Sequence, residues 1–252
     1  MFTRRGLLAG GLEAALGLAA RRALAIGPGS KFTFDQLQLG ASAGPRPGAL
    51  RRLAWEIEKR TSIDVQLDPV LVTPTSETLH ETPFLYLSGE RELELPSAAG
   101  IEALRRFLTF GGFLLIDSAE GRAGGGFDES VRRLLAQTLP GELPARIPDE
   151  HVLWKSFYVL HGAPGRILAT PNIEGVERDR RLAVVYTQND LGGALARDGF
   201  GRWEHEVVPG GEDQREEAFR LAINLVMYAL CLDYKTEQAH IDYILRTRRL
   251  PR

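Results

Sequence analysis

The sequence predicts a single α/β domain built on a doubly wound, mostly parallel sheet. Short apolar runs alternate with amphipathic helical patterns along the chain. The run at 113–116 is apolar at every position, which is typical of a strand covered on both faces. With 252 residues, 44% of them hydrophobic and 25% charged, the chain has the size and composition of one ordinary globular domain.

Apolar runs mark five predicted strands, and apolar residues at helical spacing mark the helices between them. We expect strands at 32–37, 63–67, 83–87, 113–116 and 182–186. We expect helices over 50–57, 97–110, 129–137, 214–230 and 237–246. Gly111 and Gly112 should end the second helix, because glycine readily adopts the left-handed conformation of a helix C-cap. The aromatic-rich segment 151–160 is expected to be extended or irregular.

The N-terminus has the pattern of an export signal. Arg4 and Arg5 precede a leucine- and alanine-rich run, and Ala23-Leu24-Ala25 closes the segment. This pattern predicts a twin-arginine-type signal peptide over 1–25, removed after Ala25, and a mature domain over 26–252 in the periplasm or at the envelope. The apolar run is too short for an ordinary membrane span, so no stable span is expected.

Charge and cysteine content exclude several function classes. The net charge of −2 gives no electrostatic reason to expect a nucleic-acid partner. The single cysteine, Cys231, allows no disulfide within the chain, and its apolar helical neighbours predict a small buried side chain. No metal-ligand spacing such as H-E-x-x-H occurs, and the sequence indicates no cofactor.

Polar residues follow the predicted strands at the edge where ligands bind in open parallel sheets. The segments 40–44, 88–90, 117–121 and 189–193 are therefore expected to converge there. The candidate ligand-binding residues are Ser88, Glu90, Asp117, Ser118, Asn189 and Asp190. Asp117 has two open interpretations, a ligand contact or general base and a cap that fixes its own turn. For Asn189 and Asp190 the interpretation as an Asx-type turn is favoured.

His151 is the remaining candidate, in the one region where histidines and aromatic residues concentrate. A histidine paired with Asp117 or Asp190 could form a hydrolytic pocket, and aromatic faces could stack on a sugar. A partly buried aromatic patch beneath a loop is the favoured alternative. Asn224 lies within an apolar helical stretch, and it is expected to hydrogen-bond a loop backbone, since a buried amide without partners is costly.

Four segments, in their order and spacing, resemble the bacterial domain-of-unknown-function family 4159. They are 83–89, 111–117, 181–186 with Asn189 and Asp190, and 222–224 with Tyr228. The resemblance extends over about 32–232. It implies a flavodoxin-like fold similar to class I glutamine amidotransferases and ThuA-like proteins, and it implies no established reaction. Members of the family accompany envelope proteins with von Willebrand A domains and MoxR-type ATPases, which implies partners in a cell-envelope assembly.

The amidotransferase comparison argues against glutaminase chemistry. In those enzymes a strand presents a cysteine nucleophile at a sharp turn, whereas the matching position here holds Asp117. No catalytic residue is assigned from the sequence. We therefore expect a non-catalytic, amidotransferase-like domain that binds a ligand or protein partner in the envelope. The alternative is a hydrolase that uses Asp117 with His151 or Asp190.

Overall fold

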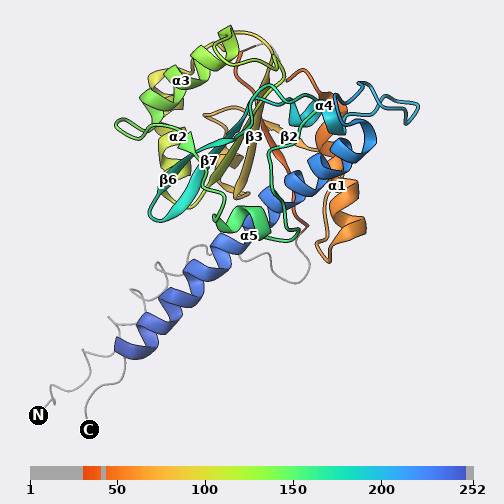
Figure 1. The fold of residues 1–252 in the computed structure, drawn as a ribbon. Helices are drawn as coiled ribbons and strands as arrows, with labels where there is room; N and C mark the ends of the chain where they lie inside the picture. Colours follow the sequence, from red (N-terminus) through yellow and green to blue (C-terminus); the bar gives the residue numbers. More distant parts are fainter. Residues whose placement is uncertain (1–30, 41–43, 248–252) are drawn as a thin grey trace, which may run out of the picture.

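A seven-stranded sheet forms the centre of the molecule (Figure 1). The computed structural model describes residues 31–40 and 44–247, and beyond Cys231 it describes only the path of the last helix. The predicted signal peptide, 1–25, lies outside the described residues. The strands are β1 (Asp35–Leu37), β2 (Val70–Val72), β3 (Phe84–Gly89), β4 (Phe113–Ser118), β5 (Ala145–Arg146), β6 (Glu174–Arg178) and β7 (Arg181–Thr187).

The strand order is β2-β1-β3-β4-β7-β6-β5. The first five of these strands run parallel, while β6 and β5 add an antiparallel edge beside β7. The predicted α/β class and mostly parallel sheet in a single domain are therefore confirmed. Because parallel strands need crossover connections, helices cover both faces of this sheet.

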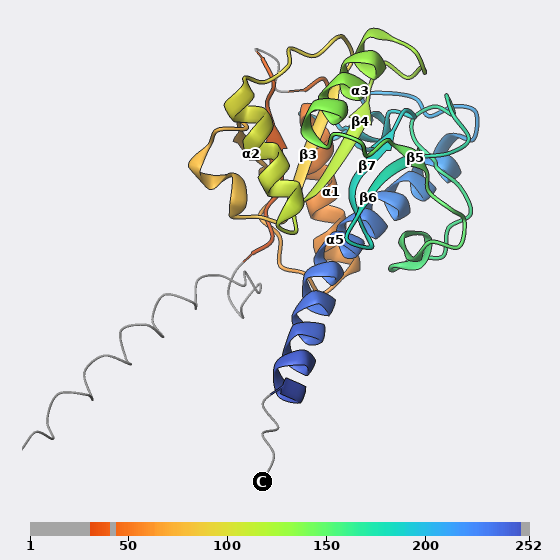
Figure 2. The same ribbon diagram turned by 90° about the vertical axis from the view of Figure 1, so that its left-hand side faces the viewer.

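Two helical layers enclose the sheet (Figure 2). One face is covered by α1 (Pro47–Arg60), the short α4 (Leu191–Leu195) and α5 (Gly211–Thr247), and the other by α2 (Ala98–Thr109) and α3 (Gly126–Thr138). Two single turns of 3₁₀ helix, η1 (Glu77–His80) and η2 (Val152–Lys155), lie in the connections. The second half of α5 extends away from the sheet.

Each face of the sheet has its own apolar core. On the α1 and α5 side, Phe34, Phe84 and Phe113 pack in sequence, with ring centroids 5.4 Å apart at each step. On the α2 and α3 side, Leu85, Leu114 and Ile116 belong to the second core. This double burial explains why β3 and β4 are apolar nearly throughout.

Several predicted boundaries need correction. The strand expected at 63–67 is wrong, because only Val65 pairs there, in a single bridge with Phe32, and β2 follows at Val70–Val72 instead. The antiparallel strands β5 and β6 were not predicted, since both are short and rich in polar residues. The two helices expected at 214–230 and 237–246 form one continuous helix, α5.

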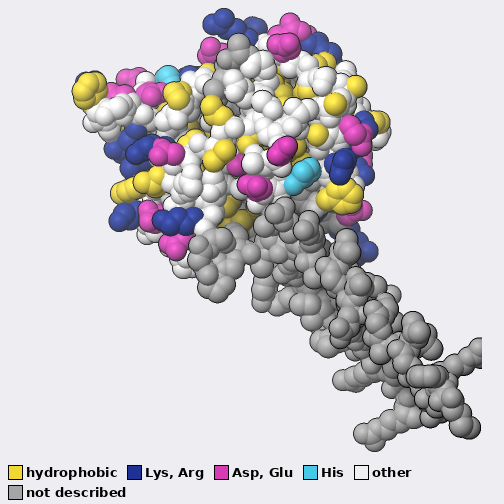
Figure 3. Space-filling view, turned by 180° about the vertical axis from the view of Figure 1, so that it is seen from behind, with side chains coloured by type: hydrophobic (Ala, Val, Ile, Leu, Met, Phe, Trp, Pro, Cys, Tyr) yellow, Lys and Arg dark blue, Asp and Glu magenta, His cyan; other side chains and the backbone are white. Residues whose placement is uncertain are grey.

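The expected burial of Cys231 is also wrong, because the side chain is exposed. It lies where α5 leaves the core, so its apolar sequence neighbours no longer indicate burial. Within the described part of the chain, no helix is long and apolar enough to cross a membrane. On the face of the molecule shown in Figure 3, acidic and basic side chains are interspersed.

Candidate functional site at the carboxyl edge of the sheet

The segments that follow β1, β3, β4 and β7 meet at one edge of the sheet. Ser88 pairs in register with Asp117, and Asp117 with Thr187, so these strands end side by side. The Ala119 N–H donates to the Gly89 carbonyl at 2.9 Å, which joins the first two loops. The loop after β1, described at Gly40 and from Gly44 onward, approaches Ser88. The predicted convergence at the carboxyl edge is therefore present in the structure.

Asp117 is fully buried at the end of β4, and both of its carboxylate oxygens are occupied. Oδ1 accepts the Leu191 N–H at 2.8 Å. Oδ2 accepts the Gly192 N–H at 2.7 Å and the Tyr86 hydroxyl at 2.8 Å. Asp117 thus acts as an acceptor for the first amides of α4. Its backbone partners begin 74 residues further along the chain, and Tyr86 is on the neighbouring strand, so none of the three belongs to its own turn.

Burial raises the pKa values of both Asp117 and Tyr86. Burial, reinforced by the nearby charge of Asp190, raises the pKa of Asp117 from 3.8 to about 6, although its three hydrogen bonds act to lower that pKa. Burial also raises the pKa of Tyr86 well above its usual range, with the Asp117 charge adding to the effect. Tyr86 therefore remains a protonated phenol that donates to the carboxylate.

Asp190 is fully buried beside Asp117 and lies between two arginines. Arg46 donates to it from Nε at 3.1 Å and from Nη2 at 2.9 Å, and Arg166 donates from Nε. Its Oδ1 also accepts the Gly193 N–H at 3.0 Å, which makes it the N-cap of α4. This cap holds Asp190 at a φ of 51°, in the left-handed region that aspartate tolerates better than most residues.

Asn189 secures the segment that precedes β6. Its side-chain amide donates to the Ala163 carbonyl at 2.6 Å and to the Thr170 carbonyl at 2.8 Å. Its Oδ1 accepts the Thr170 N–H at 2.9 Å. Both of its amide N–H groups and its oxygen have partners within the protein and the residue is fully buried, so Asn189 positions a loop.

Ser118, Ser88 and Glu90 lie at different places along the edge. Ser118 is fully buried on the side of α2 and α3, and its hydroxyl has no hydrogen-bond partner within the described residues. The Ser88 hydroxyl is buried with no hydrogen bond of normal geometry, and its polar contact is with the Tyr86 phenol. Glu90 is exposed and lies 3.7 Å from Arg91.

The structure does not bring His151 to Asp117. The His151 ring packs against Tyr228 with centroids 5.4 Å apart, and the Tyr228 hydroxyl accepts the Leu182 N–H at the start of β7. Asp117 lies at the opposite end of the sheet. The histidine near the acidic pair is His205, whose pKa is lowered by burial and by the charges of Arg46 and Arg166, with Asp190 opposing.

Arg46, Tyr86, Arg166 and His205 were missed by sequence reasoning. Tyr86 has the pattern of an ordinary strand residue, and the others lie in irregular segments without a motif. A signal was present only for Arg46, because a basic residue between two prolines in a loop that reaches the carboxyl edge can meet an acid there. Among the described residues, no group of three or more histidine, cysteine, aspartate or glutamate side chains could hold a metal ion.

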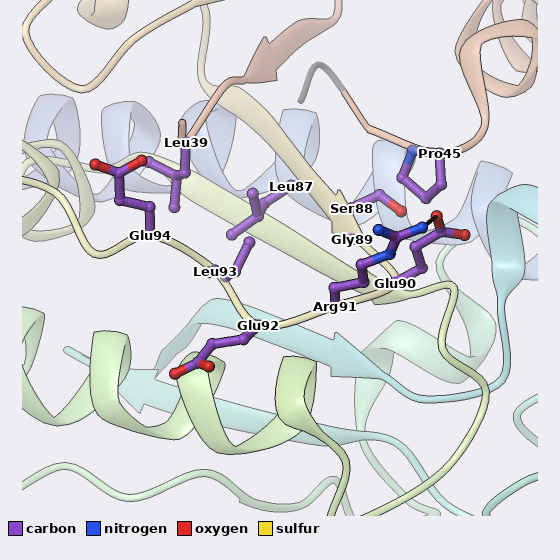
Figure 4. A pocket seen from close by; sticks show the side chains of 10 residues that line it. All are labelled: Leu39, Pro45, Leu87, Ser88, Gly89, Glu90, Arg91, Glu92, Leu93 and Glu94. Atoms are coloured by element: carbon purple, nitrogen blue, oxygen red, sulfur yellow. Dashed lines mark ion pairs between the residues drawn. The ribbon is translucent and has the colours of Figure 1, made fainter. Parts of the chain in front are cut away.

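A cavity of about 370 Å³ opens at the same edge of the sheet as Asp117 and Asp190 (Figure 4). It is lined by Leu39 and Pro45, which follow β1, and by residues 87–94 at the end of β3 and beyond. The chain passes from β1 to β2 on one side and then to β3 on the other. The cavity therefore lies at the point where the strand order reverses, which is where open α/β sheets bind ligands.

Comparison with known proteins agrees with the sequence resemblance. A family model described as Domain of unknown function (DUF4159) matches residues 34–230 of the chain. No curated protein matches it at a significant level. The matched range begins just before β1 and continues into α5, so it includes every described strand and the whole carboxyl edge.

Proposed function

Because the chain belongs to the family of the Domain of unknown function (DUF4159), whose description assigns no reaction, we propose a function from the carboxyl edge itself. The domain is a non-catalytic, amidotransferase-like binding domain that takes a ligand or a protein partner in the cell envelope. The observation that supports this proposal is the state of Asp117. Its carboxylate holds the start of α4 and has no free oxygen for a substrate.

The order of the parallel strands supports the flavodoxin-like part of this proposal. Counting only the parallel strands, β2-β1-β3-β4-β7 corresponds to the order 2-1-3-4-5, which is that of flavodoxin-type sheets. In such sheets the ligand lies between the first and third strands. The cavity lined by Leu39 and residues 87–94 has this position.

The hydrolase alternative requires a base within hydrogen-bonding reach of a nucleophile or water. Asp117 and Asp190 already accept hydrogen bonds from backbone amides, Tyr86 and two arginines. His151 packs against Tyr228 instead. The raised pKa of Asp117 is a feature of many catalytic acids, but here desolvation of a structural carboxylate accounts for it.

The envelope part of the proposal rests on the sequence of residues 1–25 and on the family resemblance. We propose export by the twin-arginine route, removal of 1–25, and partners among envelope assemblies that contain von Willebrand A domains or MoxR-type ATPases. N-terminal sequencing of the protein purified from periplasmic and cytosolic fractions tests the export. A mature chain that begins at Ile26 is expected, whereas an intact Met1 in the cytosolic fraction would contradict the proposal.

Binding can be tested by NMR with a library of small polar molecules. We expect hits that shift the backbone amides of residues 87–94. Leu93→Trp should fill the cavity and abolish these shifts, whereas Leu168→Trp, at an exposed leucine outside the cavity, should leave them unchanged. A library without hits at these amides would contradict a small-ligand site. Hydrolytic turnover lost in a folded Asp117→Asn variant would support the hydrolase.

A further inference from the structure

We propose that the cavity beside β3 binds a lysine-type ligand, in which an aliphatic chain joins a terminal ammonium group to an amide or amino-acid head. This inference rests on the proposed binding function and specifies its ligand class. It is drawn from three parts of the cavity: an apolar floor, a carboxylate that has no partner among the described residues at one end, and an ion pair at the other (Figure 4).

The floor of the cavity is made of leucines. Leu39, Leu87 and Leu93 lie in its middle and come from the segment after β1, from β3 and from the segment after β3 (Figure 4). None of the three has a polar side-chain atom, so their side chains offer no hydrogen bond to a ligand. A chain of methylene groups suits this floor, since its burial is favourable by the hydrophobic effect.

Glu94 stands at one end of this floor (Figure 4). Its side chain is exposed and forms no hydrogen bond or ion pair with the described residues. A Cβ atom built at Gly40 would lie 3.1 Å from Glu94 Oε2, so the glycine, at a φ of 74°, leaves room beside the carboxylate. A carboxylate at the end of an apolar trough is suited to an ammonium group, which can donate three hydrogen bonds.

The other end of the cavity has both an acidic and a basic side chain. Glu90 and Arg91 lie 3.7 Å apart there, and both side chains are exposed (Figure 4). A carboxylate or carbonyl of the ligand can accept from Arg91, while an amine or amide N–H can donate to Glu90. This combination suits the head of an amino acid or the backbone of a lysine residue.

The charge balance agrees with this ligand. Glu92 is engaged by Arg133 of α3 at 2.5 Å and so faces away from the cavity. The remaining lining charges are Glu90, Arg91 and Glu94, which sum to one negative charge. Lysine carries one net positive charge, both as a free amino acid and as a residue in a peptide, and so complements this sum.

The segment that contains Glu92 and Leu93 and lines the cavity is held against α3 without a ligand. The Leu93 N–H donates to Ser130 Oγ of α3 at 2.9 Å, and the Glu92 ion pair ties the same segment to α3. Ser130 itself donates to the Phe127 carbonyl at 2.8 Å, which orients its hydroxyl. A preformed wall lowers the entropy cost of binding, which favours recognition of a ligand as small as lysine.

Calorimetric titration of the full chain tests this inference. The probes are L-lysine, Nα-acetyl-L-lysine methylamide as a peptide mimic, and L-norleucine, which retains the chain and head but lacks the ammonium group. We expect at least one lysine probe to bind about tenfold more tightly than norleucine, because a hydrogen-bonded charge contributes on the order of that factor. The tighter lysine probe distinguishes a free amino acid from a peptide.

Two variants test whether Glu94 causes the preference for lysine over norleucine. Glu94→Gln should lower lysine affinity about tenfold and leave norleucine unchanged. Glu58→Gln, at an exposed glutamate of α1 outside the cavity, should change neither. Equal binding of lysine and norleucine, no binding of either lysine probe, or a lysine preference that survives Glu94→Gln would overturn the inference. The proposed function would stand in those cases if library compounds still shift residues 87–94, and would fall with it if none does.

Discussion

Tyr86 and Asp117, on the neighbouring strands β3 and β4, are joined by a buried hydrogen bond of 2.8 Å between the phenol and Oδ2. The same oxygen accepts the Gly192 N–H at the start of α4. One carboxylate therefore connects two strands of the sheet to the turn that follows β7. The role of this carboxylate in the described structure is therefore structural, since it fixes the start of α4 against β3 and β4.

Removal of this carboxylate should be costly. Asp117→Ala leaves the Leu191 and Gly192 amides and the Tyr86 hydroxyl buried without an acceptor. We expect a loss of about 3 kcal/mol in the free energy of unfolding, since each such group costs ~1–3 kcal/mol. Urea denaturation at pH 7.5 measures it, with Tyr86→Phe as the comparison, expected to lose about 1 kcal/mol. An alanine variant no less stable than Tyr86→Phe would contradict this role for Asp117.

Close packing at Gly192 gives a second prediction. A Cβ atom there would lie 2.7 Å from the Tyr86 hydroxyl and 3.0 Å from Asp117 Oδ2. Gly192→Ala should therefore lower the free energy of unfolding by about 2 kcal/mol, the usual cost of an overpacked site. Gly199 has no heavy atom within 4 Å of the equivalent position, so Gly199→Ala should stay within about 0.5 kcal/mol of the wild type. Equal effects of the two variants in thermal or urea denaturation would exclude a steric cause.

The location of the site could be predicted from sequence, but its connections could not. Buried strands that end in Ser88 and Asp117 indicate a carboxyl edge because the edge follows from local pattern and parallel topology. The partners of Asp117 lie 31 and about 75 residues away along the chain. No local pattern specifies such pairs, so whether Asp117 was a general base or a structural acceptor stayed open until its neighbours were known.

The strands and helix boundaries that were predicted wrongly from the sequence also have physical explanations. β6 lies antiparallel at the side of β7, and Val176 is its only apolar side chain apart from Gly175, so it lacks the apolar run that indicated β3 and β4. Residues 231–236 lie between the two helices predicted at 214–230 and 237–246. The backbone of α5 continues through these residues. They include no glycine or proline, the residues that most often end a helix.

Asn224 supports a third prediction. Its Oδ1 accepts the Phe157 and Tyr158 N–H groups at 3.2 and 2.7 Å, and its amide donates to the carbonyls of Leu153 and Tyr158 at 3.0 and 2.8 Å. This confirms the expected contact with a loop backbone. Asn224→Leu should lower the free energy of unfolding by about 2–3 kcal/mol, because these backbone groups lose their partner.

Hydrogen exchange separates this local effect from a general loss of stability. The amides of residues 157 and 158 should exchange faster in Asn224→Leu, beyond the change seen at the centre of β4. Ser156→Ala removes a partly exposed hydroxyl that, within the described residues, donates to the carbonyls of Val152 and Leu153, so it should leave both amides protected. Unchanged protection in Asn224→Leu would show that the segment is held by its apolar contacts.

The pH dependence of stability provides the last prediction. The pKa of Asp117 is about 6 in the folded protein and 3.8 as a free side chain, so the native state binds the proton more tightly. The stability that this group contributes is therefore full below about pH 4 and is lost as the pH rises through 6. The loss is on the order of 2–3 kcal/mol. Asp35 shows the same direction, with burial raising its pKa to about 6.

Denaturation of wild type and Asp117→Asn at several values between pH 4.5 and 7.5 isolates the contribution of Asp117. Other carboxylates, such as Glu216 with its lowered pKa beside Arg60, act in the opposite direction, so the difference between the two proteins is the quantity to compare. The wild type should lose stability relative to Asp117→Asn as the pH rises, and Asp35→Asn should give a similar but separate difference. A constant difference for Asp117→Asn across this range would mean that the three hydrogen bonds at Asp117 offset its burial, and that its folded pKa is close to the ordinary value.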